Sequence, residues 1–286
     1  MGSPNTDTPE RWAVEITPHR RIFSVPVGEI FRYRDLIYLF VRRDFVANYK
    51  QTVLGPVWFV IQPILTTVMM VFVFGKIAKL STDGIPQVLF YLGGVTLWGY
   101  FASSFNKTAT TFQSNAKLFG KVYFPRLVAP ISVAISSLIT LAIQFGLFLA
   151  FFAYFWHNGK VEPNATVFLF PLLILDLAMI ALGMGLLFSA LTTKYRDLVN
   201  LLAFGTQLLM YATPIVYPMS TLSEKYAWII SANPITGVIE TFRFGFMGAG
   251  DFSWGMLGYS TGVASLVFLL GMIVFNKVEA TFMDTV

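Results

Sequence analysis

Residues 127–156 read LVAPISVAISSLITLAIQFGLFLAFFAYFW, a run of 30 residues without one charged side chain. At 1.5 Å per helical residue, about twenty such residues cross the ~30 Å hydrocarbon core of a bilayer. The rest of the chain has the same character, because 56% of its residues are hydrophobic and only 12% are charged. A soluble domain is far less apolar and carries about twice that share of charge. The sequence therefore predicts an all-α polytopic membrane protein.

Six segments of the chain are similarly long and apolar. The predicted transmembrane helices are Val53–Gly75, Ile85–Phe105, Leu127–Trp156, Ala165–Leu191, Leu198–Tyr217 and Ser253–Phe275. Around them we expect a cytoplasmic arm and interface helix at 1–52, a six-helix transmembrane domain at 53–276 and a cytoplasmic tail at 277–286. Asp176 is the one charged residue inside the six segments. It could contact a proton or a substrate, but without a second intramembrane charge we favour a protonated or hydrogen-bonded carboxyl that faces a neighbouring helix.

Lysine and arginine residues between the helices predict the orientation, because cytoplasmic loops carry the excess of positive charge. With the N-terminus inside, 15 of the 20 basic residues fall on the cytoplasmic side. The first thirty residues are polar and contain no apolar core next to a cleavage site, so the first span itself is expected to direct insertion. We predict a multi-pass protein of the inner, cytoplasmic membrane with both termini in the cytoplasm.

Three segments outside the spans also have recognisable patterns. Glu29–Lys50 is predicted to be one unbroken amphipathic helix along the cytoplasmic interface. Its charged arc consists of Arg32, Asp35, Arg42, Arg43 and Lys50. The basic connection Asn106–Arg126 should contain one short helix. The external segment Pro218–Gly250 is half apolar and should form two short re-entrant or interfacial helices, separated by Asn233-Pro234, that rest on protein.

The sequence lacks the chemistry of a pump that binds its own nucleotide. A phosphate-binding loop ends in Gly-Lys-Ser or Gly-Lys-Thr, whereas Gly75-Lys76-Ile77 and Gly120-Lys121-Val122 supply only the first two residues. His19 and His157 fall on opposite predicted sides of the membrane, and the external acids lack metal-ligand spacing. We therefore expect no catalytic residue, no metal site and no cofactor in this chain; if ATP drives the protein, another polypeptide binds ATP and Mg. The membrane is an expected partner and nucleic acid is not.

Aromatic residues are frequent, at 16% of the chain. Most are expected to contact lipid or anchor the interfaces. A path for sugars would also gain from aromatic rings, because their flat apolar faces stack on the C–H faces of pyranoses. The candidates for such a glycan path are Tyr91, Trp98, Tyr100, Phe101 and Phe105.

Several short motifs follow one another at consistent topological positions. They are Arg43-Asp44, Tyr49, Leu54-Gly55, Trp58, Pro63, Phe124-Pro125-Arg126, Tyr195-Arg196-Asp197, Thr213-Pro214-Ile215-Val216-Tyr217-Pro218, Asn233-Pro234 and Arg243. In this order they resemble the permeases of type-2 ABC exporters for polysaccharides, closest to O-antigen export permeases and their teichoic-acid and capsule relatives. The resemblance covers about residues 35–284.

This resemblance implies a homodimer that carries two copies of a separate ATPase subunit and exports an undecaprenyl-diphosphate-linked glycan. The interface helix and the Asn106–Arg126 connection would then contact the ATPase. The residues implied in that coupling are Arg42, Arg43, Asp44, Lys117, Lys121 and Arg126. The residues implied in an external gate are Tyr217, Asn233, Pro234 and Arg243.

Other functions remain open at this stage. An exporter of teichoic acid, capsule, or a small lipid or drug would have the same architecture. A membrane-embedded glycosyl or phosphoryl transferase belongs to another class. The density of aromatic residues favours a sugar path over a drug path, and the missing cluster of acids argues against a transferase.

Overall fold

The computed structural model of the chain describes residues 27–50, 52–119, 124–195 and 197–282. Throughout these residues the regular structure is helical and no strand occurs, which confirms the all-α prediction. The predicted arm before residue 27 and the last four residues lie outside the described part.

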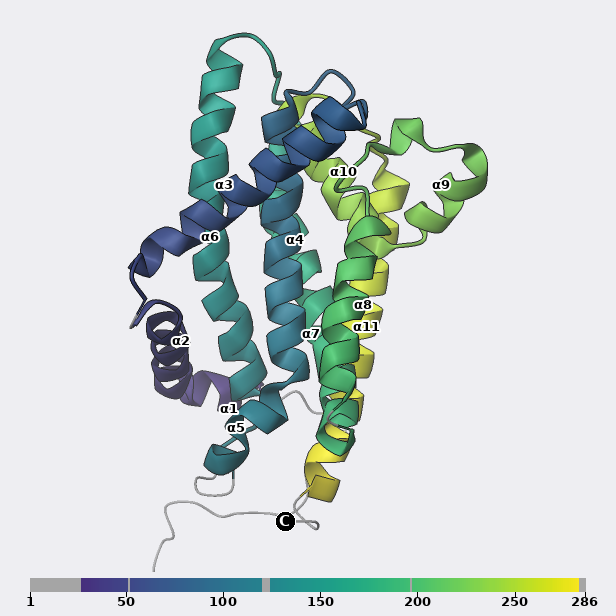
Figure 1. Ribbon diagram of the computed structural model, residues 1–286. Coiled ribbons are helices and arrows are strands. Elements are labelled where there is room, and N and C mark those ends of the chain that lie inside the picture. The colour runs from purple at the N-terminus through teal and green to yellow at the C-terminus, as the bar shows by residue number, and fades with distance from the viewer. Residues whose placement is uncertain (1–26, 51, 120–123, 196, 283–286) are drawn as a thin grey trace, which may run out of the picture.

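Five helical segments are long and apolar enough to cross a membrane. They run side by side in Figure 1, where the first crosses the others obliquely. Their elements are η1 (Gly55–Val57), α3 (Trp58–Met70) and the π-helical η2 (Val71–Ile77), then α4 (Gln87–Ala109), α6 (Val128–His157), η3 (Ala165–Leu169) with α7 (Phe170–Lys194), and α11 (Trp254–Phe282). Each begins within two residues of the start predicted from the sequence. These five spans are confirmed as helices.

The remaining predicted span is shorter than expected. Helix α8 (Leu198–Tyr211) has 14 residues, or roughly 21 Å at 1.5 Å per residue, and the prediction of a helix up to Tyr217 is wrong. The helix ends because Pro214 has no backbone N–H to donate and disfavours helix in the residue before it. The Thr213 hydroxyl donates to the Leu209 carbonyl at 2.8 Å, and the following residues form a turn. The described residues thus contain five long spans and one shorter apolar helix.

The predicted interface helix is interrupted once. Helix α1 (Val27–Arg32) is separated from α2 (Arg34–Tyr49) at Tyr33, so the prediction of one unbroken helix is wrong. Tyr33 has a ψ of 21°, and this turn lets its ring pack against the cluster around Phe40 and Phe124. The Phe40 and Phe124 rings lie 5.7 Å apart, edge to face. Helix α2 therefore buries an apolar face against the beginning of α6.

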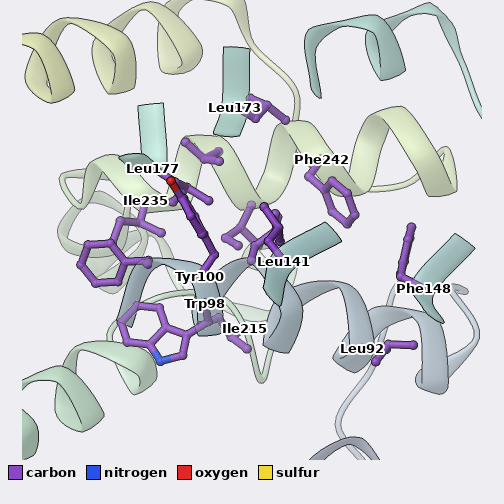
Figure 2. Close-up of a cluster of buried hydrophobic side chains, with 14 of the residues drawn as sticks. Leu92, Trp98, Tyr100, Leu141, Phe148, Leu173, Leu177, Ile215, Ile235 and Phe242 are labelled. Carbon is purple, nitrogen blue, oxygen red and sulfur yellow. The ribbon is translucent and has the colours of Figure 1, made fainter. Parts of the chain in front are cut away.

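Helix α4 lies at the centre of the bundle. In the most apolar 18-residue stretch of α4, 72% is buried within the protein. In the corresponding stretch of the first span, 17% is buried. Figure 2 shows side chains of α4 packed among residues of α6, α7 and the shorter helix α10 (Pro234–Met247). The labelled residues are Leu92, Trp98 and Tyr100 of α4, Leu141 and Phe148 of α6, Leu173 and Leu177 of α7, Ile215, and Ile235 and Phe242 of α10.

Helices α7 and α11 approach each other through two glycines. A Cβ atom built on Gly183 would lie 2.6 Å from the backbone nitrogen of Phe268. A Cβ atom built on Gly271 would collide with the backbone carbonyl of Gly183. Small residues of this kind allow membrane helices to pack with their backbones almost in contact.

The two ends of the bundle differ. Helices α1, α2 and α5 (Thr111–Phe119) lie at one end, together with the C-terminal end of α11, while α9 (Glu224–Ser231) and α10 lie at the other (Figure 1). The predicted pair of short helices split by Asn233-Pro234 is therefore confirmed. A third short element, η4 (Met219–Thr221), precedes them. Twelve of the 14 residues of α10 are buried, so this helix rests on protein.

Candidate functional site

Helices α2 and α5 are joined by a polar contact that the sequence did not reveal. The Arg43 guanidinium donates from Nη1 to Asn115 Oδ1 at 3.2 Å, and its Nη2 lies 2.8 Å from Asp44 Oδ1. The same guanidinium lies 4.7 Å from the centre of the Phe40 ring. Arg43 thus links both elements that were predicted to contact an ATPase. Asn115 was missed, although a buried polar residue on the apolar side of α5 is a recognisable signal.

Arg126 lies beneath α5 rather than on its surface. Its side chain is only 6% exposed, and its guanidinium lies 5.6 Å from the ring of Phe119 and 5.9 Å from that of Phe112. Phe112 in turn stacks on Phe275 of α11 with 4.9 Å between the ring centres. Such cation–π contacts stabilise the helix that supplies the rings. Any contribution of Arg126 to coupling would therefore act through the position of α5.

The other basic candidates are distributed along the same end of the molecule. Arg42 and Lys50 are exposed and line a shallow groove of about 460 Å³ along α2. Lys117 belongs to α5, and Lys121 lies outside the described residues. Their role in an ATPase contact stays a prediction.

Helix α5 is also tied to the end of α7. The Gln113 amide donates to the Thr192 carbonyl, and the Thr192 hydroxyl donates to the Ala109 carbonyl at 2.6 Å. The Gln113 bond and the contacts of Phe112 hold α5 against α7 and α11, and the Thr192 bond joins α7 to the end of α4, directly before α5. A force on α5 would reach those spans directly.

At the opposite end, Asn233 connects α10 to the turn that follows α8. Its side-chain oxygen accepts a hydrogen bond from the Ile235 N–H at 3.1 Å and so caps α10. Its amide nitrogen donates to the Thr213 hydroxyl at 2.8 Å. Pro234 occupies the first turn of α10, where its missing N–H costs nothing. The Tyr217 hydroxyl donates to the Tyr211 carbonyl at 2.9 Å and closes the same turn.

Arg243 forms a buried junction among three elements. Its Nη1 donates to Glu240 Oε1 at 3.0 Å, and its Nη2 donates to the Ile215 carbonyl at 3.1 Å. The guanidinium lies 3.7 Å from the centre of the Phe90 ring of α4. Arg243 and Glu240 are each only 1% exposed. Burial raises the pKa of the Glu240 carboxyl, and the Arg243 charge opposes that shift. The sequence singled out Arg243 but not its partner Glu240.

The aromatic residues predicted to line a glycan path are buried within the chain. Tyr91, Trp98 and Phe101 belong to the central core. Phe105 lines an apolar cavity of about 400 Å³ between α4, α7 and α8, and Tyr100 lines a second, polar cavity described below. Their role in a path stays a prediction.

The polar cavity is a groove of about 390 Å³ between α3, α4 and α6. Its lining combines amides, hydroxyls, aromatic rings and one lysine. The residues that define it are Trp58 and Gln62 of α3, Ser103 and Lys107 of α4, and Thr140 and Gln144 of α6. This mixed lining distinguishes it from the apolar cavity beside Phe105.

Asp176 of α7 is buried and faces α11. The Thr261 hydroxyl donates to Asp176 Oδ2 at 2.8 Å, and the carboxyl is fully buried. The prediction of a hydrogen-bonded carboxyl turned toward a neighbouring helix is confirmed.

A bundle of membrane-length helices, with a tethered helix pair at one end and short buried helices at the other, has the architecture of a multi-pass transport permease. The sequence profile of the ABC-2 type transporter family matches residues 35–247. The chain belongs to this family.

Relatives of the chain are export permeases of bacteria. It is 29% identical to an O-antigen export system permease protein, RfbA, of Klebsiella pneumoniae, over 87% of this chain and 94% of the relative. It is 27% identical to RfbA of Myxococcus xanthus, over 76% of this chain and 82% of the relative. The polysialic acid transport protein KpsM of Escherichia coli is 23% identical, over 83% of this chain and 91% of the relative.

Proposed function

We propose that this chain is the transmembrane subunit of an ATP-driven exporter that moves an undecaprenyl-diphosphate-linked polysaccharide of O-antigen type across the inner membrane. It works as a homodimer with two copies of a separate ATPase subunit, which bind ATP and Mg. Similarity to O-antigen export permeases over nearly their whole length supports this cargo class. The chain itself has no catalytic role in this proposal.

The observation that carries the proposal is the Arg43–Asn115 contact between α2 and α5. It joins the two elements that a soluble ATPase would contact, and we call this joined pair of helices the ATPase seat. Closure of two ATPase subunits would push on this seat, and α5 would transmit the push to α7 and α11 through Gln113 and Phe112. The resulting shift between protomers would open a central path for stepwise export.

At the external end, the Asn233 and Arg243 contacts tie α10 to the turn after α8 and to α4. Movement of α4 or α8 would therefore carry α10 with it. In this proposal α9 and α10 are the external gate, and α10 is a re-entrant helix that rests on the bundle.

The function is tested by reconstituting the permease with its ATPase in vesicles and measuring ATP-dependent movement of lipid-linked glycan. The wild-type complex should export, and the permease alone should neither hydrolyse ATP nor export. Arg43→Ala should lower export per ATP hydrolysed by several fold, because it frees α2 from α5. Lys160→Ala, an exposed change at the other end, is the control. If both variants exported the same amount of glycan per ATP hydrolysed, the Arg43–Asn115 contact would have no part in coupling. If the wild-type complex exported nothing, the proposed function would be contradicted.

The proposed orientation places α1, α2, α5 and both termini in the cytoplasm. It is supported by the excess of basic residues at that end and by the shared location of α1 and the end of α11 in Figure 1. Single cysteines at Ser81 and Asn158 should react with a membrane-impermeant reagent added from outside. Cysteines at Ser114 and Thr193 should react only after permeabilisation. The chain has no native cysteine, so each label reports one site, and the opposite pattern would reverse the orientation.

A further inference from the structure

The polar groove between α3, α4 and α6 contains amide groups without partners at membrane depth. Gln62 and Gln144 form no hydrogen bond with the described residues, although both line the groove. The Gln144 Oε1 atom lies 3.6 Å from the position of a Cβ built on Gly99, so the absence of a side chain at Gly99 leaves room beside the amide. An amide left without a partner in hydrocarbon costs several kcal/mol. Water or a polar ligand in the groove would supply the missing hydrogen-bond partners.

The groove extends from one surface of the bundle toward the middle of the membrane. Lys107 lies two residues before the end of α4, whereas Val95, which also lines the groove, lies in its middle third. These twelve positions correspond to roughly 18 Å along the helix. The side formed by α3 is lightly covered, because the Trp58 and Gln62 side chains are exposed. The headgroup of a membrane lipid could therefore enter the groove from the leaflet next to Lys107.

The lining chemistry fits a sugar attached to a phosphate. Lys107 supplies the positive charge for a phosphate at the membrane surface. The amides of Gln62 and Gln144 and the hydroxyls of Ser103 and Thr140 can bond sugar hydroxyls, and the Trp58 and Tyr100 rings offer apolar faces to a pyranose. A volume of about 390 Å³ accommodates one or two sugar rings but not a long chain.

We propose that this groove binds the diphosphate-linked first sugars of the lipid-linked cargo, with the diphosphate at Lys107 and the lipid tail left in the bilayer. This inference rests on the proposed function. It assigns to α3, α4 and α6 the step in which the headgroup leaves the cytoplasmic leaflet, before it enters the path between protomers. The polar lining replaces the water that the headgroup gives up.

The groove is tested by native mass spectrometry of the purified permease with a polyprenyl diphosphate that carries one N-acetylglucosamine. Lys107→Gln and Gln144→Leu should each weaken binding by about tenfold, the loss expected for one charged or buried hydrogen bond. Lys160→Gln, at the proposed external end, and Ser265→Ala, whose hydroxyl donates within α11 to the Thr261 carbonyl, should bind like the wild type. Size-exclusion profiles establish that each variant is folded, and Thr140→Val and Ser103→Ala give milder changes to the same lining.

Competition separates the ligand from other anions. Inorganic diphosphate and phosphatidylglycerol should displace the probe at least tenfold less well than unlabelled probe. Unchanged affinity in both Lys107→Gln and Gln144→Leu would overturn the inference, as would equal competition by phosphatidylglycerol. If the wild-type complex exports glycan and the groove variants export equally well, the proposed function stands and the groove assignment fails. If the permease binds the probe through these residues but the complex exports nothing, the groove stands and the proposed function fails.

Discussion

Replacing Arg243 with methionine should lower the unfolding temperature of the purified permease more than any other single charge removal. The change leaves Glu240 buried without its partner, and removing one member of a buried ion pair costs about 3–5 kcal/mol. It also leaves the Ile215 carbonyl without its donor and removes the guanidinium from the Phe90 ring. Thermal unfolding in detergent, followed by size exclusion, measures the effect.

The loss should grow with pH. Burial already raises the pKa of the Glu240 carboxyl, and without Arg243 no charge opposes that shift. The folded variant then holds the proton more tightly than the unfolded chain, so its stability falls as pH rises above the carboxyl's unfolded pKa. The destabilisation by Arg243→Met should therefore be greater at pH 8 than at pH 5.

Two controls define the origin of the effect. Arg243→Met combined with Glu240→Gln should recover part of the lost stability, because no charge stays buried. Arg42→Met removes an exposed arginine and should change the unfolding temperature little. An equal, small shift in Arg243→Met and Arg42→Met would show that the Arg243–Glu240 pair does not stabilise the end of the bundle that contains α10.

Gly271→Val should reduce the yield of folded protein severely. The new side chain would collide with the Gly183 carbonyl, and this obstacle is backbone that cannot rotate away. Overpacking of this kind typically costs 1–3 kcal/mol and occasionally more. The measurement is the fraction of detergent-extracted protein that elutes as a single, non-aggregated species.

The matched control is Gly262→Val, which lies on the same helix. A Cβ on Gly262 would meet no atom within 4 Å, so this variant has the same change in helix propensity without the collision. It should fold with nearly wild-type yield. If both variants lost yield equally, close packing of α7 and α11 would not be the cause.

The long spans could be predicted because their length and apolarity are local properties. The end of α8 was mislocated because the apolar run continues to Tyr217, while Pro214 ends the helix earlier. The break at Tyr33 could not be predicted, because the Tyr33 ring packs against a cluster that includes Phe124 and Val128, which are remote in the sequence. The turn at Tyr33 thus goes with a tertiary contact that the local sequence does not show.

The candidate site was predictable where a residue carries its own signal. Asn233-Pro234 was predicted to separate two short helices, and the structure shows Asn233 as the cap of the second of them. Glu240 was missed because its importance comes from Arg243, and Asn115 was missed because its position on the apolar side of α5 does not show that Arg43 approaches it in the folded chain. The frequency of aromatic residues does not distinguish aromatic side chains that pack in the core from those that would line a glycan path.

The contrast in burial between the first span and α4 has a consequence for how the protein is made. α3 is covered by its own chain over little of its surface, so lipid can surround it as soon as it leaves the ribosome. α4 carries buried hydroxyls at Thr96 and Thr108 that lack partners among the described residues, and α6, α7 and α10, which cover it, are synthesised later. Until they arrive, the surface of α4 that is buried in the folded chain is exposed to lipid, so α4 more than α3 would mark an unfinished chain for a membrane chaperone or protease.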